Sequence, residues 1–538
     1  LDPGTNTVFL TNPSRLAATY GQTAATEVAA KLADTVGYLR MNLQKGLTPA
    51  VVPVDIYPAV REAYAAWDAN PCSVPAANAV TAALTGVLEE VRSAGNDLKY
   101  VTLVGGDDIL PMGRVPDLSR VANESGYADN FLGADNPLSA STAGGYTLSD
   151  DPYGDTSPTS LTNGGSLFIP RVAVGRLVET PAEIGAALAA YIAKEGTLDT
   201  STGLVSGYDF LSDGATATAD RLAVDGRTVD RLIDPPGTTP GWSGQNLLDS
   251  LFPTGHASPL VASLNAHYDH QALLSSAGDL TDGNDLVTQD EVSGPAGTDK
   301  LAGRVFFTMG CHAGLSVPDA YVSGTNAAGA AQDWAQTLAA ANVAVYVANT
   351  GFGIGDSASV AYSERLMALF AKLLDGSMTV GQALTWAKQS YYGSLGAVGV
   401  YDSKILQQTA FYGLPFWEVD TGHPAPAAPT RPALTGVMTP DVATGLQSVE
   451  VELNPDLAPV SAAGRTHWTV RGQDPQVTQF QPIQPRLSVP VGDSGLVAHG
   501  ALIGTLESHD VAGVTPNVST PVVDTSAAAP PVRSDDAA

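Results

Sequence analysis

The sequence predicts an α/β protein with a parallel sheet, followed by a small all-β module. Up to residue 422, short apolar runs alternate with segments of helical spacing, the pattern of strands that pair in parallel through helical crossovers. Two of these runs, Leu260–His267 and Arg304–Cys311, end on residues capable of acyl-transfer chemistry. Beyond them, a proline-rich stretch leads into short alternating runs rich in Val and Thr, which favours a β-sandwich.

The predicted strands are short and apolar, and several are followed by a segment with helical spacing. In chain order they are Thr7–Thr11, Ala50–Ile56, Leu98–Asp108, Phe168–Arg176, Leu204–Asp209, Leu260–His267, Arg304–Cys311, Val343–Asn349 and Phe411–Val419. The predicted helices are Ala24–Met41, Val80–Ala94, Pro181–Lys194, Ala219–Val224, Val360–Leu374 and Thr379–Tyr391. Residues 115–166 are polar and without periodicity, so we expect a long functional or ion-stabilised loop there.

Changes in composition divide the chain into five parts. Residues 1–198 and 199–422 are two βα subdomains, and residues 423–432 form a Pro-rich linker. Residues 433–525 are the expected β-sandwich, and residues 526–538 read as a disordered tail.

The charge balance excludes several classes of partner. The chain carries 26 Lys and Arg against 55 Asp and Glu, a formal charge of −29, which repels nucleic acid and anionic lipid. No apolar run approaches the roughly 20 residues needed to span a bilayer, so we expect no membrane insertion.

Cys72 and Cys311 are the two cysteines, too few for a disulfide scaffold. Cys72 lies in a loop context without an activating partner.

The two strand ends at His267 and Cys311 predict nucleophilic catalysis. Neighbouring parallel strands place their carboxyl ends at one crevice, where an imidazole could take the proton of a thiol. The turn after Cys311 is built of small residues and can supply backbone N–H groups to an oxyanion. His270 is a rival for the base, and His312 lies beside the nucleophile in the chain. The pattern therefore predicts a cysteine peptidase.

This order of strands resembles the caspase-like cysteine peptidases, and among them the gingipain family. Tyr100–Asp107 is similar to the family's Val-Gly-Asp strand end, and Ser149–Asp155 followed by Arg171–Arg176 is similar to its polar loop and Gly-Arg strand. Phe411–Pro415 resembles the turn that closes the catalytic unit. The resemblance covers about residues 5–420. It implies a three-layer α/β/α catalytic unit of two βα subdomains, followed by an immunoglobulin-like sandwich.

The resemblance also implies roles for individual residues. Cys311 is the nucleophile and His267 the base, with Asp209 supporting the imidazole and backbone N–H groups of Tyr268 and Cys311 holding the oxyanion. The family usually has Gly where this chain has Tyr268, so a side chain must be accommodated there.

Substrate selection is implied in the same way. Asp220 lies eleven positions after Asp209 (220 − 209 = 11). It matches the family's acid that selects a basic P1 residue, with Arg as the favoured one. Phe352, in the loop Thr350–Asp356, matches the apolar side of that pocket.

The family commonly carries structural calcium, and two acidic groups are candidates for it. One is Asp150, Asp151 and Asp155, and the other includes Asp282 and Asp285. Neither group fits the twelve-residue EF-hand pattern, and both are also typical of solvated turns. We expect no cofactor for the chemistry itself.

The resulting expectation is a secreted, monomeric cysteine endopeptidase that acts on proteins or peptides and cleaves after a basic residue. Two alternatives stay open. The first is a catalytically silent binding or surface protein on the same scaffold, which the Tyr268 departure and the long polar loops favour. The second is a dedicated processing peptidase with a single protein substrate.

The first residues, Leu1–Thr5, do not resemble a signal peptide.

Overall fold

A computed structural model describes most of the first 428 residues and short parts of the remainder. The described ranges are residues 4–127, 136–161, 165–224, 226–279, 283–293, 300–321, 332–356, 359–395, 398–428, 438–440, 442, 445–450, 457–462 and 465–470. The chain divides into two compact units, of which the first comprises residues 1–391 and 400–426.

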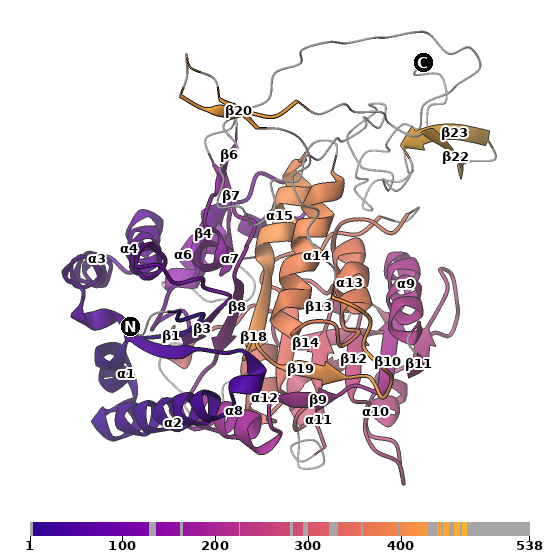
Figure 1. Cartoon of the computed structure of the whole chain (residues 1–538). Helices are drawn as coiled ribbons and strands as arrows, with labels where there is room; N and C mark the ends of the chain where they lie inside the picture. Colours follow the sequence, from indigo (N-terminus) through magenta and orange to yellow (C-terminus); the bar gives the residue numbers. More distant parts are fainter. Residues whose placement is uncertain are drawn as a thin grey trace. The chain divides into compact units, whose positions relative to one another are not determined.

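The first unit is built on one ten-stranded sheet that both predicted βα subdomains share (Figure 1). The strand order is β11-β10-β12-β16-β17-β18-β8-β3-β1-β2. In chain order these strands are β1 (Thr7–Thr11), β2 (Pro49–Pro53), β3 (Tyr100–Val104), β8 (Ala173–Leu177), β10 (Thr202–Gly207), β11 (Thr228–Ile233), β12 (Val261–Leu264), β16 (Val305–Phe307), β17 (Val345–Asn349) and β18 (Thr409–Gly413). β1, β3 and β17 are buried along their whole length, as strands covered on both faces must be.

The two halves of the sheet point in opposite directions. The first half consists of β1, β2, β3 and β8, which are mutually parallel. The second half consists of β10, β12, β16 and β17, which are also mutually parallel. β18 joins the halves, because it runs antiparallel to β17 and parallel to β8. The carboxyl ends of the first half therefore lie at one edge of the sheet, and those of the second half lie at the other.

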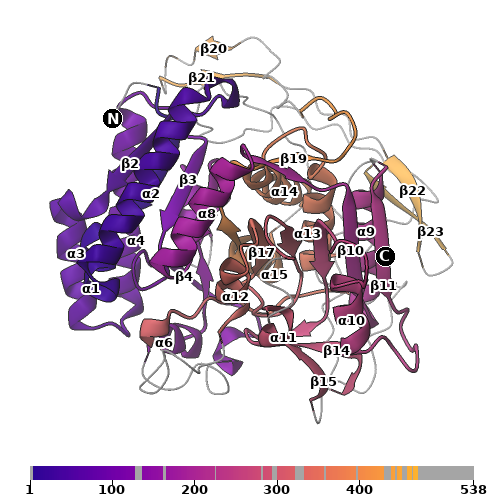
Figure 2. The same ribbon diagram turned by 90° about the horizontal axis from the view of Figure 1, so that it is seen from below.

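Helices cover both faces of this sheet. They are α1 (Pro13–Tyr20), α2 (Gln22–Met41), α3 (Pro58–Ala69), α4 (Val74–Ser93), α8 (Pro181–Ala193), α9 (Ser212–Ala223), α10 (Gly244–Leu251), α11 (Gln289–Ser293), α12 (Trp334–Ala340), α13 (Tyr362–Leu373), α14 (Val380–Ser394) and α15 (Val400–Gln408). α2 and α8 lie side by side over the first half (Figure 2). α8 begins with a capping box between Thr180 and Glu183, as its sequence predicts.

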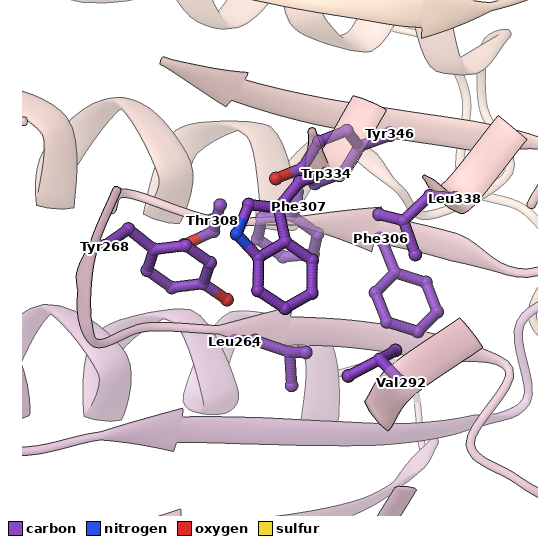
Figure 3. A pocket seen from close by; sticks show the side chains of 9 residues that line it. All are labelled: Leu264, Tyr268, Val292, Phe306, Phe307, Thr308, Trp334, Leu338 and Tyr346. Carbon is purple, nitrogen blue, oxygen red and sulfur yellow. The ribbon is translucent and has the colours of Figure 1, made fainter. Parts of the chain in front are cut away.

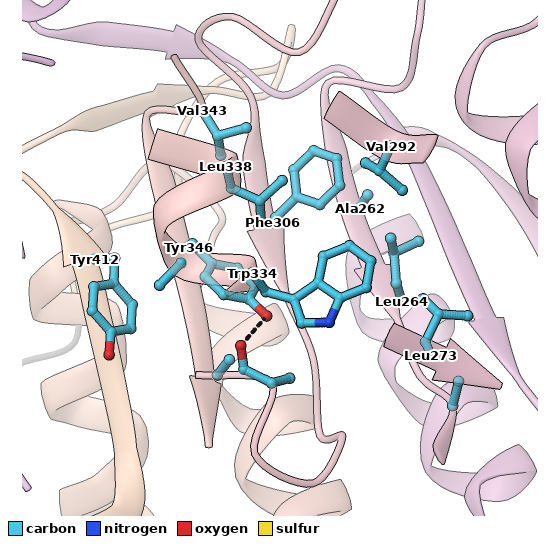
Figure 4. Close-up of a cluster of buried hydrophobic side chains, with 14 of the residues drawn as sticks. Ala262, Leu264, Leu273, Val292, Phe306, Trp334, Leu338, Val343, Tyr346 and Tyr412 are labelled. Carbon is cyan, nitrogen blue, oxygen red and sulfur yellow. Dashed lines mark hydrogen bonds between the residues drawn. The ribbon is translucent and has the colours of Figure 1, made fainter. Parts of the chain in front are cut away.

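Alternate residues of the second-half strands point to opposite faces. On one face, Phe306 and Tyr346 pack with Trp334 and Leu338 of α12 and with α10 and α11 (Figure 4). On the other face, Phe307 meets Phe370 of α13 with ring centroids 5.3 Å apart. Burial of large apolar side chains on both faces fixes the strand register, since a slip by one residue would exchange the two sets.

The polar stretch 115–166 contains more regular structure than we expected. It begins at the end of β4 (Gly113–Pro116) and includes η3 (Glu124–Gly126), α6 (Pro137–Ala143), β5 (Tyr146–Ser149), α7 (Asp151–Gly154) and β6 (Thr159–Ser160), and β7 (Ser166–Leu167) pairs with β6. Buried ion pairs hold much of this segment in place. Asp117 bonds to Lys404 at 2.7 Å, and Asp150 bonds to Arg176 at 2.5 Å. Apolar periodicity does not predict these helices and strands, because buried ion pairs hold the segment against the rest of the fold.

The second unit is described only in part. Its hairpins are β20 (Thr439–Pro440) with β21 (Gln447–Ser448), and β22 (Leu457–Ala462) with β23 (Arg465–Val470). Most of the predicted sandwich (433–525) and the whole predicted tail (526–538) lie outside the described residues, so both stay predictions. Among the helices that the structure describes, none is long and apolar enough to cross a membrane.

Candidate active site

Three neighbouring strands bring Asp209, His267 and Cys311 to the same edge of the sheet. Paired residues of β10 and β12 are 58 positions apart, and those of β12 and β16 are 44 apart. The same offsets relate His267 to the other two residues (267 − 58 = 209; 267 + 44 = 311). They lie two, three and four residues beyond the ends of β10, β12 and β16 (209 − 207, 267 − 264 and 311 − 307), where the loops after neighbouring parallel strands meet. We call Asp209, His267 and Cys311 the cysteine edge.

Asn265 ties the three strand ends together. Its backbone and side-chain N–H groups bond to Ser206 at 3.0 Å, on the β10 side. Its side-chain oxygen accepts the N–H of Met309 at 3.2 Å, on the β16 side. Asn349, at the end of β17, donates to the carbonyl of Met309 at 3.1 Å. Sequence reasoning missed both asparagines, because each lies in or next to an apolar run and has no catalytic chemistry of its own.

His267 is the partly exposed imidazole of this edge. It lies in β13 (His267–Tyr268), and its Nε2 atom is 3.8 Å from Oδ2 of Asp209. The rings of Tyr208 and Phe210 flank it with centroids 5.6 and 5.5 Å away. The imidazole lowers the pKa of Asp209, so this carboxylate is charged at neutral pH and can stabilise an imidazolium. The structure thus brings Asp209 to His267, with side chains 60% and 23% exposed.

Cys311 is in a resting arrangement. Its Sγ lies 3.7 Å from the carbonyl oxygen of Gly353, and burial raises the pKa of the thiol to about 11. The thiol is therefore protonated at neutral pH and needs a base to become a nucleophile. Within the described residues, its hydrogen-bond partner is this carbonyl and not an imidazole.

The rival histidines have other partners. His270 is buried, its Nδ1 lies 2.7 Å from the hydroxyl of Tyr127, and burial lowers its pKa to about 4. His312 is fully buried, with Nε2 2.8 Å from the carboxylate of Glu124. Neither ring is open to a substrate, which favours His267 as the base.

The side chain of Tyr268, at the position where the family usually has glycine, fits because residue 310 is a glycine. A Cβ atom on Gly310 would lie 2.4 Å from the Tyr268 ring, so the missing side chain of Gly310 makes room for it. The ring lines a cavity of about 10 Å³ together with Trp334, its T-shaped neighbour at 5.5 Å (Figure 3). A space of this size holds one water molecule at most, so it is not a substrate pocket.

The loop Thr350–Asp356 lies beside the thiol. The Phe352 ring meets His312 at a centroid distance of 4.5 Å and Tyr127 at 5.9 Å. Its N–H donates to Glu124 at 2.8 Å, and its carbonyl accepts from Gln408 at 2.7 Å. Phe352 is thus a fixed, partly buried side chain next to the nucleophile turn.

Asp220 lies in a helix with an ion-pair partner of its own, and its role as a pocket acid stays a prediction. Residues 212–223 form the helix α9, so Asp220 lies about 12 Å along the helix from Ser212 at 1.5 Å per residue. Its carboxylate is 61% exposed and pairs with Arg231 at 2.7 Å. Among the described contacts, the partner of this carboxylate is Arg231, and none joins it to the cysteine edge.

Two other carboxylates, Glu364 and Asp213, lie together beside the loop Thr350–Asp356. Glu364, at the start of α13, is fully buried and accepts the N–H of Asp356 at 3.3 Å. Burial, and after it the charge of Asp213, raises the pKa of Glu364 to about 9. Burial also raises the pKa of Asp213, which shares a hydrogen bond with Glu364. Asp213 stands in the same segment as Asp209, but no pattern in the sequence singles out Glu364.

The predicted calcium ligands are already engaged. Asp150 bonds to Arg176, Asp151 bonds to Lys388 at 2.6 Å, and Asp155 accepts the backbone N–H groups of residues 157 and 169. Asp285 accepts from Ser275 and from the N–H of residue 244, and Asp282 lies outside the described residues. In the part of the chain that the structure describes, no three acidic, His or Cys side chains form a metal site. The described carboxylates of both groups therefore have protein partners, and the calcium sites stay a prediction.

Comparison with known proteins agrees with this geometry. Peptidase family C25 matches the chain over residues 30–419. Solved structures similar to the chain include a complex of the pro- and mature domains of Porphyromonas gingivalis RgpB (14% identity, TM-score 0.47, 81% of this chain and 85% of that chain). The Arg-specific cysteine proteinase gingipain R (RGPB) has 14% identity and a TM-score of 0.47 over 82% and 85% of the two chains. A separase–securin complex of Saccharomyces cerevisiae has 10% identity and a TM-score of 0.30 over 46% and 14%. No curated protein matches the chain.

Proposed function

This chain belongs to peptidase family C25, and from that premise we propose that it is an endopeptidase with Cys311 as nucleophile and His267 as base. The observation that carries the proposal is that Asp209, His267 and Cys311 follow the ends of three adjacent parallel strands, β10, β12 and β16, with Nε2 of His267 3.8 Å from Oδ2 of Asp209. A cysteine peptidase needs a thiol and an imidazole that a rigid scaffold holds within reach of each other. The partial exposure of His267 leaves room for a substrate to reach both groups.

The proposed reaction begins with rotation of the thiol from Gly353 towards His267. The imidazole takes the thiol proton, and the thiolate attacks the scissile carbonyl. The N–H groups of Cys311 and Tyr268 stabilise the resulting oxyanion. His267 then gives the proton to the leaving amine, and water, activated by the same imidazole, hydrolyses the thioester. Asp209 stabilises the imidazolium at each stage.

We place recognition of a basic P1 residue at Asp213 instead of Asp220. Burial raises the pKa of Glu364 to about 9, so Glu364 is protonated at neutral pH and places no negative charge beside Asp213. Glu364 also bonds to Asp356, in the loop whose Gly353 carbonyl holds the thiol. A partly buried carboxylate near the nucleophile favours an Arg or Lys side chain through a charge-assisted hydrogen bond.

Hydrolysis of peptide-coumarin substrates that differ only at P1 tests the proposal, with wild type and Cys311→Ala side by side. We expect cleavage after Arg or Lys in the wild type and none in the variant. Cleavage after acidic or apolar residues would reject the P1 assignment and retain the peptidase. If the wild type cleaves no short peptide, a binding protein or a dedicated processing peptidase replaces the general endopeptidase. Cleavage of one protein from an extracellular extract would identify the latter.

A further inference from the structure

A single turn of the first half of the fold contacts all three loops around the nucleophile. The turn is η3 (Glu124–Gly126) with the next residue, Tyr127. Glu124 is fully buried, and its Oε2 is 2.8 Å from Nε2 of His312, the residue directly after Cys311. Its Oε1 lies 2.7 Å from the ammonium of Lys404 and accepts the N–H of Phe352 at 2.8 Å.

Tyr127 adds the third loop. Its ring stacks on the imidazole of His312 with centroids 3.3 Å apart and planes 8° from parallel. Its hydroxyl accepts the N–H of His270 at 3.2 Å and lies 2.7 Å from Nδ1 of the same residue. His270 is three positions after His267, so one phenol links the nucleophile turn to the histidine turn.

The backbone at these contacts is tightly constrained. His312 has φ 53°, a left-handed conformation that costs free energy in a residue with a side chain. Its N–H donates to the carbonyl of Gly351 at 2.8 Å. A Cβ atom on Gly351 would lie 2.3 Å from Oε1 of Glu124, so only glycine fits beside this carboxylate. The Glu124 contacts hold His312 in a conformation that the turn would not adopt without support.

We propose that Glu124 and Tyr127 are positioning residues of the peptidase reaction, which hold the Cys311 turn, the His267 turn and the Phe352 loop in one catalytic arrangement. The proposal rests on the assignment of Cys311 as nucleophile. It gives the first half of the fold, which carries no member of the dyad, an indirect part in catalysis through positioning. Neither residue touches the reacting atoms; both act through His312, His270 and Phe352.

The charge of Glu124 provides a measurement that distinguishes a positioning role from a general effect on folding. Burial raises the pKa of the Cys311 thiol most, and the hydrogen bond to Gly353 lowers it. The carboxylate of Glu124 raises this pKa, and the ammonium of Lys404 lowers it. Loss of the charge in Glu124→Gln should therefore make the thiol more acidic and more reactive towards a small alkylating reagent. Loss of positioning should slow peptide hydrolysis at the same time. A merely structural role would not move the two rates in opposite directions.

The experiment compares Glu124→Gln with a matched control, Asp150→Asn. Asp150 is also a buried carboxylate of the first half, paired with Arg176, but it contacts none of the three loops. For each variant we would measure kcat and KM, the pH profile of Cys311 alkylation by iodoacetamide, and the unfolding midpoint. In Glu124→Gln we expect kcat to fall by about 100-fold with a smaller change in KM. Its alkylation profile should shift to lower pH, while the control shows neither change.

Tyr127→Phe gives a second test if Glu124→Gln does not fold. It keeps the stacked ring and removes only the hydroxyl that holds His270, so we expect kcat to fall by about 10-fold with an unchanged alkylation profile. Kinetic constants and alkylation profiles equal to those of Asp150→Asn would overturn the proposal. If the wild type has no peptidase activity, the proposed function fails. The alkylation profiles of folded Glu124→Gln and Asp150→Asn would then still decide whether Glu124 controls the nucleophile turn.

Discussion

The two halves of the sheet carry polar groups at their carboxyl ends, but the two edges differ in access to solvent. At the cysteine edge, His267 and Asp209 are partly exposed. At the other edge, the strands β3 and β8 lead to Asp107, Asp108 and Glu179, which we call the carboxylate edge. All three of these side chains are buried, and Asp107 pairs with Arg114 at 2.7 Å. Parallel topology concentrates polar residues at both edges, and solvent access decides which edge can meet a substrate.

The difference extends to protonation. Burial raises the pKa of Asp108 to about 6 and that of Glu179 to about 9, so at neutral pH Glu179 keeps its proton. At the cysteine edge, His267 lowers the pKa of Asp209, which keeps a charge beside the imidazole. We therefore expect substitutions at the cysteine edge to change catalysis and substitutions at the carboxylate edge to change stability.

Replacement of the nucleophile should give the largest effect. In Cys311→Ala we expect hydrolysis to fall by at least about 1,000-fold, because no other group can form the thioester. The unfolding midpoint should change little. Cys72→Ala is the matched control, since that cysteine is exposed. Peptide hydrolysis by both purified variants measures the effect, and full activity in Cys311→Ala would reject the cysteine edge as the active site.

A pH-dependent change in stability should follow at the carboxylate edge. The folded-state pKa of Glu179, about 9, lies above its ordinary value of about 4.5. Between these pH values the unfolded chain has released a proton that the folded chain retains, so stability falls as pH rises through this window. Glu179→Gln should remove this loss and raise the free energy of unfolding at pH 8 by about 2–4 kcal/mol.

Urea unfolding at pH 5 and pH 8 measures this effect, and kcat should stay as in the wild type. The control is Glu89→Gln, whose exposed carboxylate pairs with Arg92 on the same helix and should show no such dependence. A Glu179→Gln variant that loses activity without losing stability would break the comparison between the two edges.

A smaller effect, confined to selectivity, should result from Asp213→Asn. Loss of the charge near the nucleophile should lower kcat/KM for Arg substrates by about 10–100-fold, the usual size of a lost hydrogen bond to a charged group. Rates on substrates with a neutral P1 residue should change much less. The ratio of kcat/KM for the Arg and Leu substrates is the measurement, and an unchanged ratio would exclude Asp213 as the P1 acid.

The parts of the site that could be predicted from the sequence are those that follow from strand pattern. The apolar runs ending at His267 and Cys311 predict adjacent parallel strands, and the α/β class is confirmed. Glu124 and Lys404 could not be predicted, because their pairing joins residues 280 positions apart (404 − 124 = 280) without any periodic signal. Buried ion pairs of this kind depend on three-dimensional packing alone.

Replacement of Asp220 should give the smallest effect, because this residue lies in a helix and not in a loop. Eleven positions from Asp209 could return to the pocket in an irregular loop, but a helix carries the side chain two turns away from the cysteine edge. An exposed ion pair such as Asp220–Arg231 contributes at most about 1 kcal/mol. Asp220→Asn should therefore leave the Arg-to-Leu ratio within about 2-fold of the wild type, under the conditions in which Asp213→Asn lowers it. The same P1 substrates measure both variants. A selective loss of Arg cleavage in Asp220→Asn would mean that α9 rearranges when substrate binds, and would restore the family position of the pocket acid.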